Sequence, residues 1–347
     1  MSKKLLACSS VLLALLALAV FGASTKPFSP GQRSLFLAHN SYPEKGQWAD
    51  RLDRALGTGT PLGVEVDLCW IPNPKTGKNA SLIAGNEKGI TGNEPTLKSY
   101  LFEHVRPIVE KALKENDKKN WPLIMVYLDI KNDPPEHLES IWGQLGEYEN
   151  WLTTAVKTKN AAQQSPLDLK PMMMFVDDTR PTPNIKEEYF YNRLPIGAKL
   201  RVFGSAKLTP PPGNLNKAQV FEAQAKMKLE DLIKEPASNY HRWWAQTHWD
   251  LMVEQSRMKD AGQWTPEKEA RLKALVNYAH KMGYFVGVWC LDGFEPGKGL
   301  GWGEGNNLGS LQAVTIRWKA AVKAGTDFVT SDQYEEAAKV IKGAGVN

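Results

Sequence analysis

Short apolar runs of strand-like composition alternate along this chain with longer segments of helical periodicity. Near-continuous apolar strands separated by amphipathic helices are typical of parallel βα units that are covered on both faces. Eight such units predict an α/β fold, the TIM (β/α)8 barrel. The expected strands are the runs 34–38, 63–68, 81–84, 123–130, 172–176, 200–203, 284–289 and 327–330.

The helices between these runs are visible in the sequence. The segments 97–114, 266–282 and 311–324 have apolar residues at helical spacing, and Thr265 and Gly283 are suitable start and stop residues for the second. A ninth run, 240–245, is rich in tryptophan and fits a strand, a helix or a loop. Because the chain shows neither internal repeats nor a low-complexity linker, we expect a single domain over residues 25–347.

The first residues have the composition of a secretory signal peptide. Lys3 and Lys4 precede an apolar run over 11–21, and small residues follow at 22–24. The run is too short for a stable membrane span. We therefore expect residues 1–24 to be removed, a mature chain that begins between Gly22 and Lys26, and a secreted or periplasmic protein without a transmembrane segment.

Charge and cysteine content limit the class of partner. The formal net charge is +5, and removal of the two lysines of the signal segment leaves +3. So mild a charge favours neither nucleic acid nor a membrane surface as the partner, and we expect a monomer that binds a small molecule. Cys69 and Cys290 both lie in apolar, strand-like runs, which favours buried free thiols over a disulfide. The 12 tryptophans fit a ligand cleft, or more simply the core.

Polar residues close four of the eight expected strands, and in a barrel the functional residues gather at the carboxyl ends of strands. These residues are His39 and Asn40, Glu65 and Asp67, Asp129 and Lys131, and Ser331 and Asp332. Alternation along a strand places residues two apart on one face. If these faces point inward, three carboxylates converge at the mouth of the barrel.

Three buried carboxylates raise one another's pKa unless a positive charge compensates them. A hard divalent cation supplies that charge and prefers oxygen ligands, and Asn40 would add a neutral amide oxygen. Lys131 adds a positive charge nearby. The simpler alternative is a set of salt bridges inside the barrel, for example Asp129 with Lys131 or Arg201.

These strand ends resemble a known superfamily. The segments Ala-His-Asn-Ser-Tyr at 38–42, Val-Glu-Val-Asp-Leu-Cys-Trp at 64–70 and Tyr-Leu-Asp-Ile-Lys at 127–131 are similar to the catalytic half of the phospholipase C-like phosphodiesterases. That superfamily includes phosphoinositide phospholipase C and the glycerophosphodiester phosphodiesterases. The resemblance implies that His39 is catalytic. It further implies that Asn40, Glu65, Asp67 and Asp129 hold Ca²⁺ or Mg²⁺.

On this basis the sequence predicts a metal-dependent phosphodiester hydrolase. Its substrate would be a glycerophosphodiester or a similar lipid headgroup, with His39 as general base. Lys131 is the second predicted catalytic residue, and Arg201 and Trp289 are predicted to contact substrate. Two alternatives stay open. One is a phospho-ligand-binding barrel that has lost turnover, and the other is a secreted glycoside hydrolase that uses a carboxylate pair.

One position departs from the family pattern. The related enzymes carry a second catalytic histidine after the third strand, where it protonates the leaving group, but this chain has Asn86 there. An amide does not deliver a proton at neutral pH. In an active enzyme that role would have to pass to Glu87, if burial raises its pKa, or to His248 or another loop residue.

Overall fold

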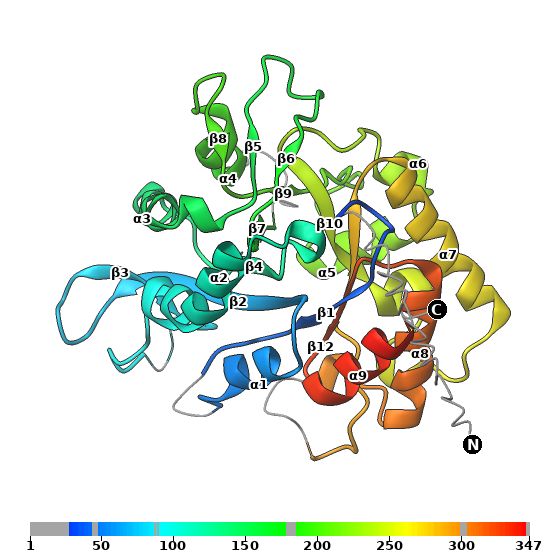
Figure 1. The fold of residues 1–347 in the computed structure, drawn as a ribbon. Helices are drawn as coiled ribbons and strands as arrows, with labels where there is room; N and C mark the ends of the chain where they lie inside the picture. Colours follow the sequence, from blue (N-terminus) through cyan, green and yellow to red (C-terminus); the bar gives the residue numbers. More distant parts are fainter. Residues whose placement is uncertain are drawn as a thin grey trace, which may run out of the picture.

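Eight parallel strands form the barrel in the computed structural model, which describes residues 28–43, 48–86, 88, 90–177, 185–298 and 304–344 (Figure 1). Their order around the barrel is β7, β4, β2, β1, β12, β11, β10 and β9. The ring is completed just before β9, where Phe203 pairs with Phe175: the Phe203 amide donates to Met174 and the Val176 amide donates to Phe203, each over 3.0 Å. The predicted TIM barrel is confirmed.

The barrel strands are short and almost wholly buried. Their bounds are β1 Leu35–Ala38, β2 Leu62–Pro72, β4 Ile124–Ile130, β7 Met172–Val176, β9 Gly204–Ser205, β10 His241–His248, β11 Phe285–Trp289 and β12 Phe328–Ser331. Strands covered by helices outside and by side chains inside have no solvent face, and this explains their continuous apolar composition.

Helices cover the outside of the barrel, and α7, α8, α9 and α1 follow one another around one side of it (Figure 1). The predicted start and stop at Thr265 and Gly283 are confirmed: the Thr265 hydroxyl caps α7, and Gly283 has the left-handed φ of +84°. The bounds are α1 Arg51–Gly57, α2 Glu103–Glu115, α3 Pro135–Glu147, α4 Ile185–Glu187, α5 Lys217–Ala225, α6 Leu229–Leu232, α7 Pro266–Lys281, α8 Leu311–Ala324 and α9 Tyr334–Ala344.

One of the eight predicted barrel strands was wrong, and a run that the sequence left unassigned takes its place in the barrel. The run 81–84 belongs to β3 (Asn79–Ile83), which pairs antiparallel with β2 and lies outside the barrel. The tryptophan-rich run, left open in the sequence, forms the barrel strand β10. A short apolar run shows neither the direction of a strand nor its partner, whereas the aromatic composition of β10 suits the barrel interior.

Aromatic side chains fill the barrel. The Trp243 ring lies 4.7 Å from Phe175 and 5.0 Å from Tyr127, centroid to centroid, and its indole nitrogen donates to the Val176 carbonyl over 3.0 Å. A buried indole needs such a partner for its N–H group. The sequence left open whether the tryptophans line a ligand cleft or belong to the core. They belong to the core where the side chain is fully buried, as in Trp243, Trp244, Trp249 and Trp318.

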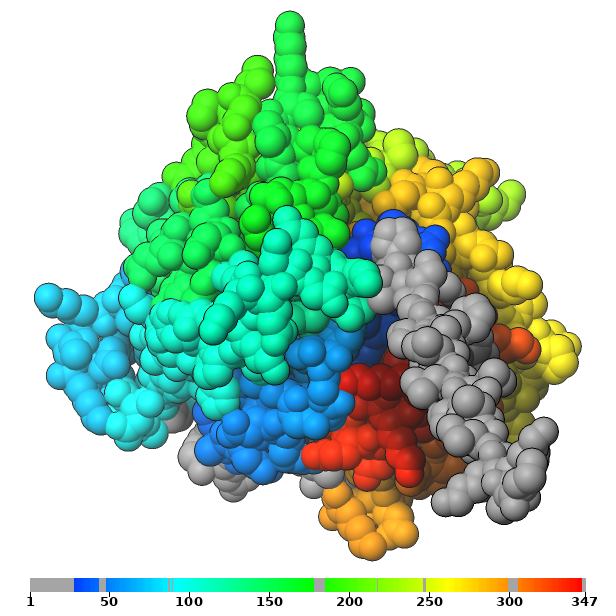
Figure 2. All heavy atoms as spheres, in the orientation of Figure 1, coloured from blue at the N-terminus to red at the C-terminus, as the bar shows by residue number. Residues whose placement is uncertain are grey.

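The β2–β3 hairpin projects from the body of the molecule (Figures 1 and 2). It is fixed to α3 by His137, whose ring stacks on Trp70 and bonds the Ser81 hydroxyl over 2.9 Å. His137 lies in α3 and is fully buried. A second small sheet joins β5 (Thr154–Val156), β6 (Leu167–Asp168) and β8 (Lys199–Leu200), so the predicted strand 200–203 is divided between this sheet and the barrel.

The N-terminal prediction concerns residues that lie outside the described part of the chain. Residues 1–27 are not described, so the signal peptide stays a prediction. Among the described residues, no helix has the length and apolar character needed to cross a membrane. Cys69 and Cys290 are both buried and free, as predicted.

Candidate functional site

The candidate site lies at the carboxyl ends of five consecutive strands, β4, β2, β1, β12 and β11. His39, Cys290 and Asp332 each occupy the position directly after a strand, on β1, β11 and β12 respectively. Glu65 and Asp67 lie on β2, and Asp129 lies on β4. The convergence predicted from alternation is therefore present at one mouth of the barrel.

His39 is held from one side of its ring. Its Nδ1 lies 3.0 Å from Asp332 Oδ2, and the Trp289 ring meets the imidazole edge-on at 4.7 Å between centroids. Burial opposes a charge on His39, but Asp332, Glu65 and Asp292 outweigh it and raise the pKa of the imidazole to about 9. The carboxylate at Nδ1 leaves Nε2 as the nitrogen that can exchange a proton with a ligand.

Asp332 is itself fixed by a buried cation. Arg51, the first residue of α1 and 1% exposed, donates to Asp332 Oδ1 over 3.0 Å. Burial alone would raise the pKa of Asp332, but His39 and Arg51 hold it below its usual value. A charged carboxylate at Nδ1 therefore orients the His39 ring and stabilises its protonated form.

Three carboxylates form a second group beside His39. Oxygens of Glu65, Asp67 and Asp129 lie within 4.8 Å of one another. The register explains this convergence, because Asp67 and Asp129 are direct partners on neighbouring parallel strands. Burial, followed by the charge of Glu65, raises the pKa of Asp67 well above its usual value. Burial likewise raises the pKa of Glu65.

Lys131 supplies part of the positive charge that compensates the three carboxylates. Its Nζ lies 2.8 Å from Asp67 Oδ2 and 2.6 Å from Asp129 Oδ2. Partial burial opposes the ammonium charge, yet Asp67 and Asp129 outweigh it and raise the pKa of Lys131. The salt-bridge alternative is therefore present in the structure. It neutralises one of the three negative charges and leaves the others to a further cation.

The residues of the carboxylate group fit a hard divalent cation. Asp67 Oδ1 is buried and has no hydrogen-bond partner, which is costly for a carboxylate oxygen unless a cation meets it. Glu65, Asp67 and Asp129 would hold the ion with carboxylate oxygens, the ligands that Ca²⁺ and Mg²⁺ prefer.

Asn40 lies between His39 and the carboxylate group. Its backbone has the left-handed φ of +50°, and its amide N–H donates to Glu65 Oε2 over 2.5 Å. Its side-chain Oδ1 lies 3.1 Å from the Tyr42 hydroxyl, which donates to Asp67 Oδ2 over 2.6 Å. Strained backbone of this kind is concentrated at functional sites. Asn40 thus lies between His39 and the carboxylates, as a ligand role would require.

Cys290 and Asp292 complete the surroundings of His39. The Cys290 sulfur lies 3.4 Å from His39 Nδ1 and 3.3 Å from Asp292 Oδ2. The other oxygen of Asp292 accepts from the Ser331 hydroxyl and from the Asp332 amide. Burial and the charge of Asp332 raise the pKa of Asp292 to about 6.

Of the two predicted substrate contacts, the structure brings only Trp289 to this site. Arg201 lies elsewhere, with its guanidinium paired to Glu149 over 2.7 Å and stacked on Trp142 of α3 at 4.5 Å. An arginine in a strand-like run gives no sign of which end of the barrel it will face.

The missing acid is not supplied at Asn86. The Ala84 amide donates to the Asp67 carbonyl over 3.2 Å, so β3 does lead back to the mouth of the barrel. There Asn86 is exposed, and its side chain accepts from the Lys88 amide over 2.8 Å. Glu87 lies outside the described residues. His248 ends β10, where its register partner is Trp289.

Sequence reasoning assigned no role to Asp332, Arg51, Cys290 or Asp292. Asp332 was visible as a polar residue at a strand end, but its pairing with His39 depends on β1 and β12 being neighbours, 293 positions apart in the chain. Arg51 carries no sequence signal, because an arginine at the start of a helix is usually exposed.

No protein-family model and no curated protein matches the chain. Several solved structures are similar to it. Two glycerophosphodiester phosphodiesterase structures from Parabacteroides distasonis are each 12% identical to it, with TM-scores of 0.40 and 0.42. The first match covers 92% of this chain and 90% of that chain, and the second covers 90% and 98%.

A dihydropteroate synthase from Clostridium difficile is also 12% identical to the chain, with a TM-score of 0.37 and coverage of 92% and 98%. Glycerophosphodiester phosphodiesterases, the family that the motifs resemble, are thus among the similar structures. At such low identities and TM-scores, these likenesses carry no information on the chemistry of the site.

Proposed function

We propose that this protein is an exported, metal-dependent phosphodiester hydrolase that acts on a glycerophosphodiester or a similar small headgroup. The observation that carries the proposal is the juxtaposition at one barrel mouth of an oriented histidine and a carboxylate group with an unpartnered buried oxygen. His39 lies against Asp332, and Asp67 Oδ1 lies among Glu65 and Asp129. A general base beside a cation-binding group is the arrangement that attack on a phosphodiester needs.

His39 has the geometry of a general base. When the imidazole is neutral and Nδ1 is held by Asp332, Nε2 takes the proton of the attacking oxygen as the new bond to phosphorus forms. The imidazolium that results is stabilised by the negative charge of Asp332, which Arg51 fixes in place. The leaving oxygen departs with the electron pair of the broken P–O bond and takes up a proton.

Lys131 and the bound cation would stabilise the negative charge that develops on phosphorus oxygens. The cation, held by Glu65, Asp67 and Asp129, would act as a Lewis acid when bound. Lys131 already lies within 2.8 Å of Asp67 and therefore stands beside the same position. A fixed ammonium there needs no reorganisation during the reaction.

The contacts of the carboxylates argue against the glycoside hydrolase alternative. A glycosidase needs two carboxyl groups with separate roles, one as general acid and one as nucleophile or general base. Here Lys131 forms ion pairs with both Asp67 and Asp129, and oxygens of all three carboxylates lie within 4.8 Å of one another. That mechanism also gives the buried His39–Asp332 pair no role.

A substrate screen tests the proposal directly. The purified protein is assayed with glycerophosphodiesters, an aryl phosphodiester and aryl glycosides, each with Ca²⁺, with Mg²⁺ and with chelator. We expect turnover of the phosphodiesters, loss of it in chelator, and no glycoside cleavage. Turnover that survives chelation would refute the metal dependence, and glycoside cleavage would favour the alternative. If the protein binds cation and phosphodiester but never turns over, it is a ligand-binding barrel.

The substitution Asn86→His tests whether the leaving group lacks an acid. We expect it to raise the rate on alkyl phosphodiesters, because their leaving groups need a proton. The increase should be up to about 10²–10⁴-fold, the usual contribution of general-acid assistance. An activated aryl ester should gain little, since its leaving group departs without a proton. Asn79→His, at the outer end of β3, is the matched control. Equal gains on both substrates would show that position 86 is not the acid position.

A further inference from the structure

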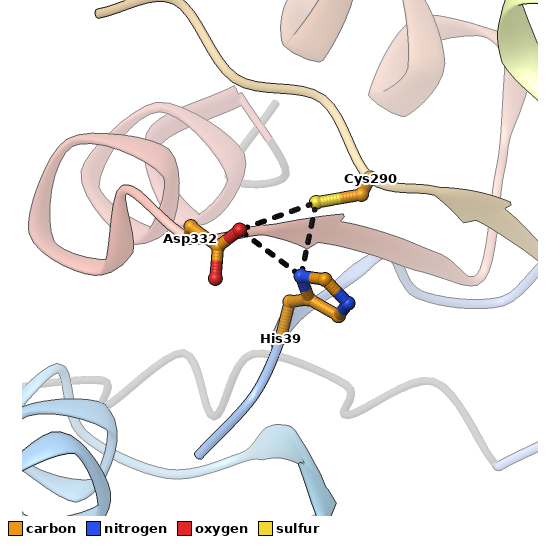
Figure 3. Close-up of side chains that lie close together, drawn as sticks. All are labelled: His39, Cys290 and Asp332. Atoms are coloured by element: carbon orange, nitrogen blue, oxygen red, sulfur yellow. Dashed lines mark hydrogen bonds and ion pairs between the residues drawn. The ribbon is translucent and has the colours of Figure 1, made fainter. Parts of the chain in front are cut away.

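Figure 3 shows that His39, Cys290 and Asp332 form a compact triangle of potential metal ligands. The three side chains point toward one another from the ends of β1, β11 and β12, which are neighbours in the barrel. Backbone hydrogen bonds hold the strand ends in place: the His39 amide donates to Ser331, and the Leu291 amide donates to Thr330. All three side chains are buried. The triangle is therefore preformed by the fold.

We propose that this triangle is a second, inhibitory metal site that binds a soft divalent cation of the zinc class. Imidazole nitrogen, thiolate sulfur and carboxylate oxygen are the ligands that Zn²⁺ uses in proteins. The carboxylate group nearby offers only oxygen and suits Ca²⁺ or Mg²⁺. The two groups would thus select different metals at one barrel mouth.

The distances in the triangle match a tetrahedral ion with little movement. Zn²⁺ with ordinary bond lengths of about 2.0–2.3 Å separates its ligand atoms by about 3.3–3.6 Å. The observed separations are 3.0 Å from His39 Nδ1 to Asp332 Oδ2 and 3.4 Å from Nδ1 to the Cys290 sulfur. The third is 3.8 Å, from the sulfur to Asp332 Oδ2. Shifts of a few tenths of an ångström would admit the ion.

The charges around the triangle are complementary to a divalent cation. Binding displaces the thiol proton of Cys290, and the thiolate then adds to the charges of Asp332 and Asp292. Arg51 holds Asp332 through Oδ1 and leaves Oδ2 for the ion. Three negative charges against Arg51 and a divalent ion sum to zero. The side-chain nitrogen of Asn40, 2.9 Å from His39 Nδ1, is neutral and does not change this sum.

Occupancy of the triangle would silence His39, and this step rests on the proposed function. A metal on Nδ1 leaves the proton of the neutral imidazole on Nε2. Nε2 then has no lone pair with which to accept the proton of an attacking oxygen. The soft metal would therefore inhibit without displacing the cation of the carboxylate group.

Cobalt spectroscopy tests the site without relying on activity. Co²⁺ replaces Zn²⁺ in such sites, and a thiolate ligand gives it a charge-transfer absorption that oxygen ligands do not. The full chain is titrated with Co²⁺ in excess Mg²⁺. Cys8, the third cysteine of the sequence, is replaced by serine in every protein compared, so that only Cys69 and Cys290 can supply a thiolate. We expect one equivalent of thiolate-bound cobalt, which Zn²⁺ displaces, and inhibition that follows the same titration.

Cys290→Ala and Cys69→Ala are matched variants, because each removes one of the two buried free thiols. Cys69→Ala should keep the absorption. Cys290→Ala should lose it, bind Zn²⁺ about 10–100-fold more weakly or worse, and resist inhibition. Far-ultraviolet circular dichroism confirms that both fold. No absorption in the parent, or absorption that persists in Cys290→Ala, overturns the proposal. Absorption without inhibition upholds the site and refutes His39 as the base.

Discussion

Replacement of His39 by alanine is expected to lower kcat/KM for phosphodiesters by about 10²–10⁴-fold, the usual contribution of a general base. The affinity of the carboxylate group for Ca²⁺ or Mg²⁺ should change little, because the imidazole is a proton acceptor in this mechanism and not a ligand of that ion. Steady-state kinetics and calorimetric titration of the metal measure the two quantities separately.

His104→Ala is the matched control for this substitution. His104 is an exposed histidine of α2 whose ring pairs with the exposed Asp53 of α1. It should keep full activity. If His39→Ala retained activity within a few fold of the parent, His39 would not be the base. If it lost the metal as well, His39 would belong to the coordination sphere.

Asp332→Asn distinguishes a positioning role from a merely structural one. The amide can donate to Nδ1 and so favour the wrong tautomer of His39, an exchange that costs a comparable triad about 10⁴-fold. Asp332 also raises the pKa of His39, so its loss should move the acid limb of the pH–rate profile to lower pH. A fall in rate at an unchanged acid limb would indicate a purely structural contribution.

The barrel could be predicted from the sequence because the evidence for its strands and helices is local. Continuous apolar strands and capped helices such as α7 depend on residues within a few positions of one another. Partner choice is not local. The run 81–84 could not be told from a barrel strand, because a short apolar run fits an antiparallel hairpin with β2 as well as a parallel strand of the barrel. The lumen position of Trp243 in β10 appears only once Phe175 and Tyr127, which are distant in the chain, pack against it.

The same division explains the site. Glu65, Asp67 and Asp129 were predictable because alternation and adjacent strands decide where they point. Arg51 and the Asp332–His39 pair were not, because they depend on closure of the barrel between the two ends of the chain. The position of Arg201 was unpredictable for a related reason: its partners Glu149 and Trp142 come from α3 and the turn that follows it.

Asp67→Asn is expected to have effects of opposite sign on activity and on stability without metal. The variant should lose most of its turnover, because the oxygen that best fits the cation becomes a weaker, neutral ligand. In chelator, it should be at least as stable as the parent. Burial and Glu65 raise the pKa of Asp67, so the metal-free fold favours an uncharged group there, and the amide is one.

Thermal unfolding with and without metal separates these effects. A ligand that binds only the folded state stabilises it by about 2.7 kcal/mol at 100 times its Kd. The parent should therefore gain in Tm on addition of Ca²⁺ or Mg²⁺, and Asp67→Asn should gain little or nothing. Asp53→Asn, an exposed aspartate of α1, is the matched control and should respond like the parent. If Asp67→Asn were less stable in chelator yet gained the full metal-dependent increase, Asp67 would be a structural partner of Lys131 and Tyr42, and the cation site would have to lie elsewhere.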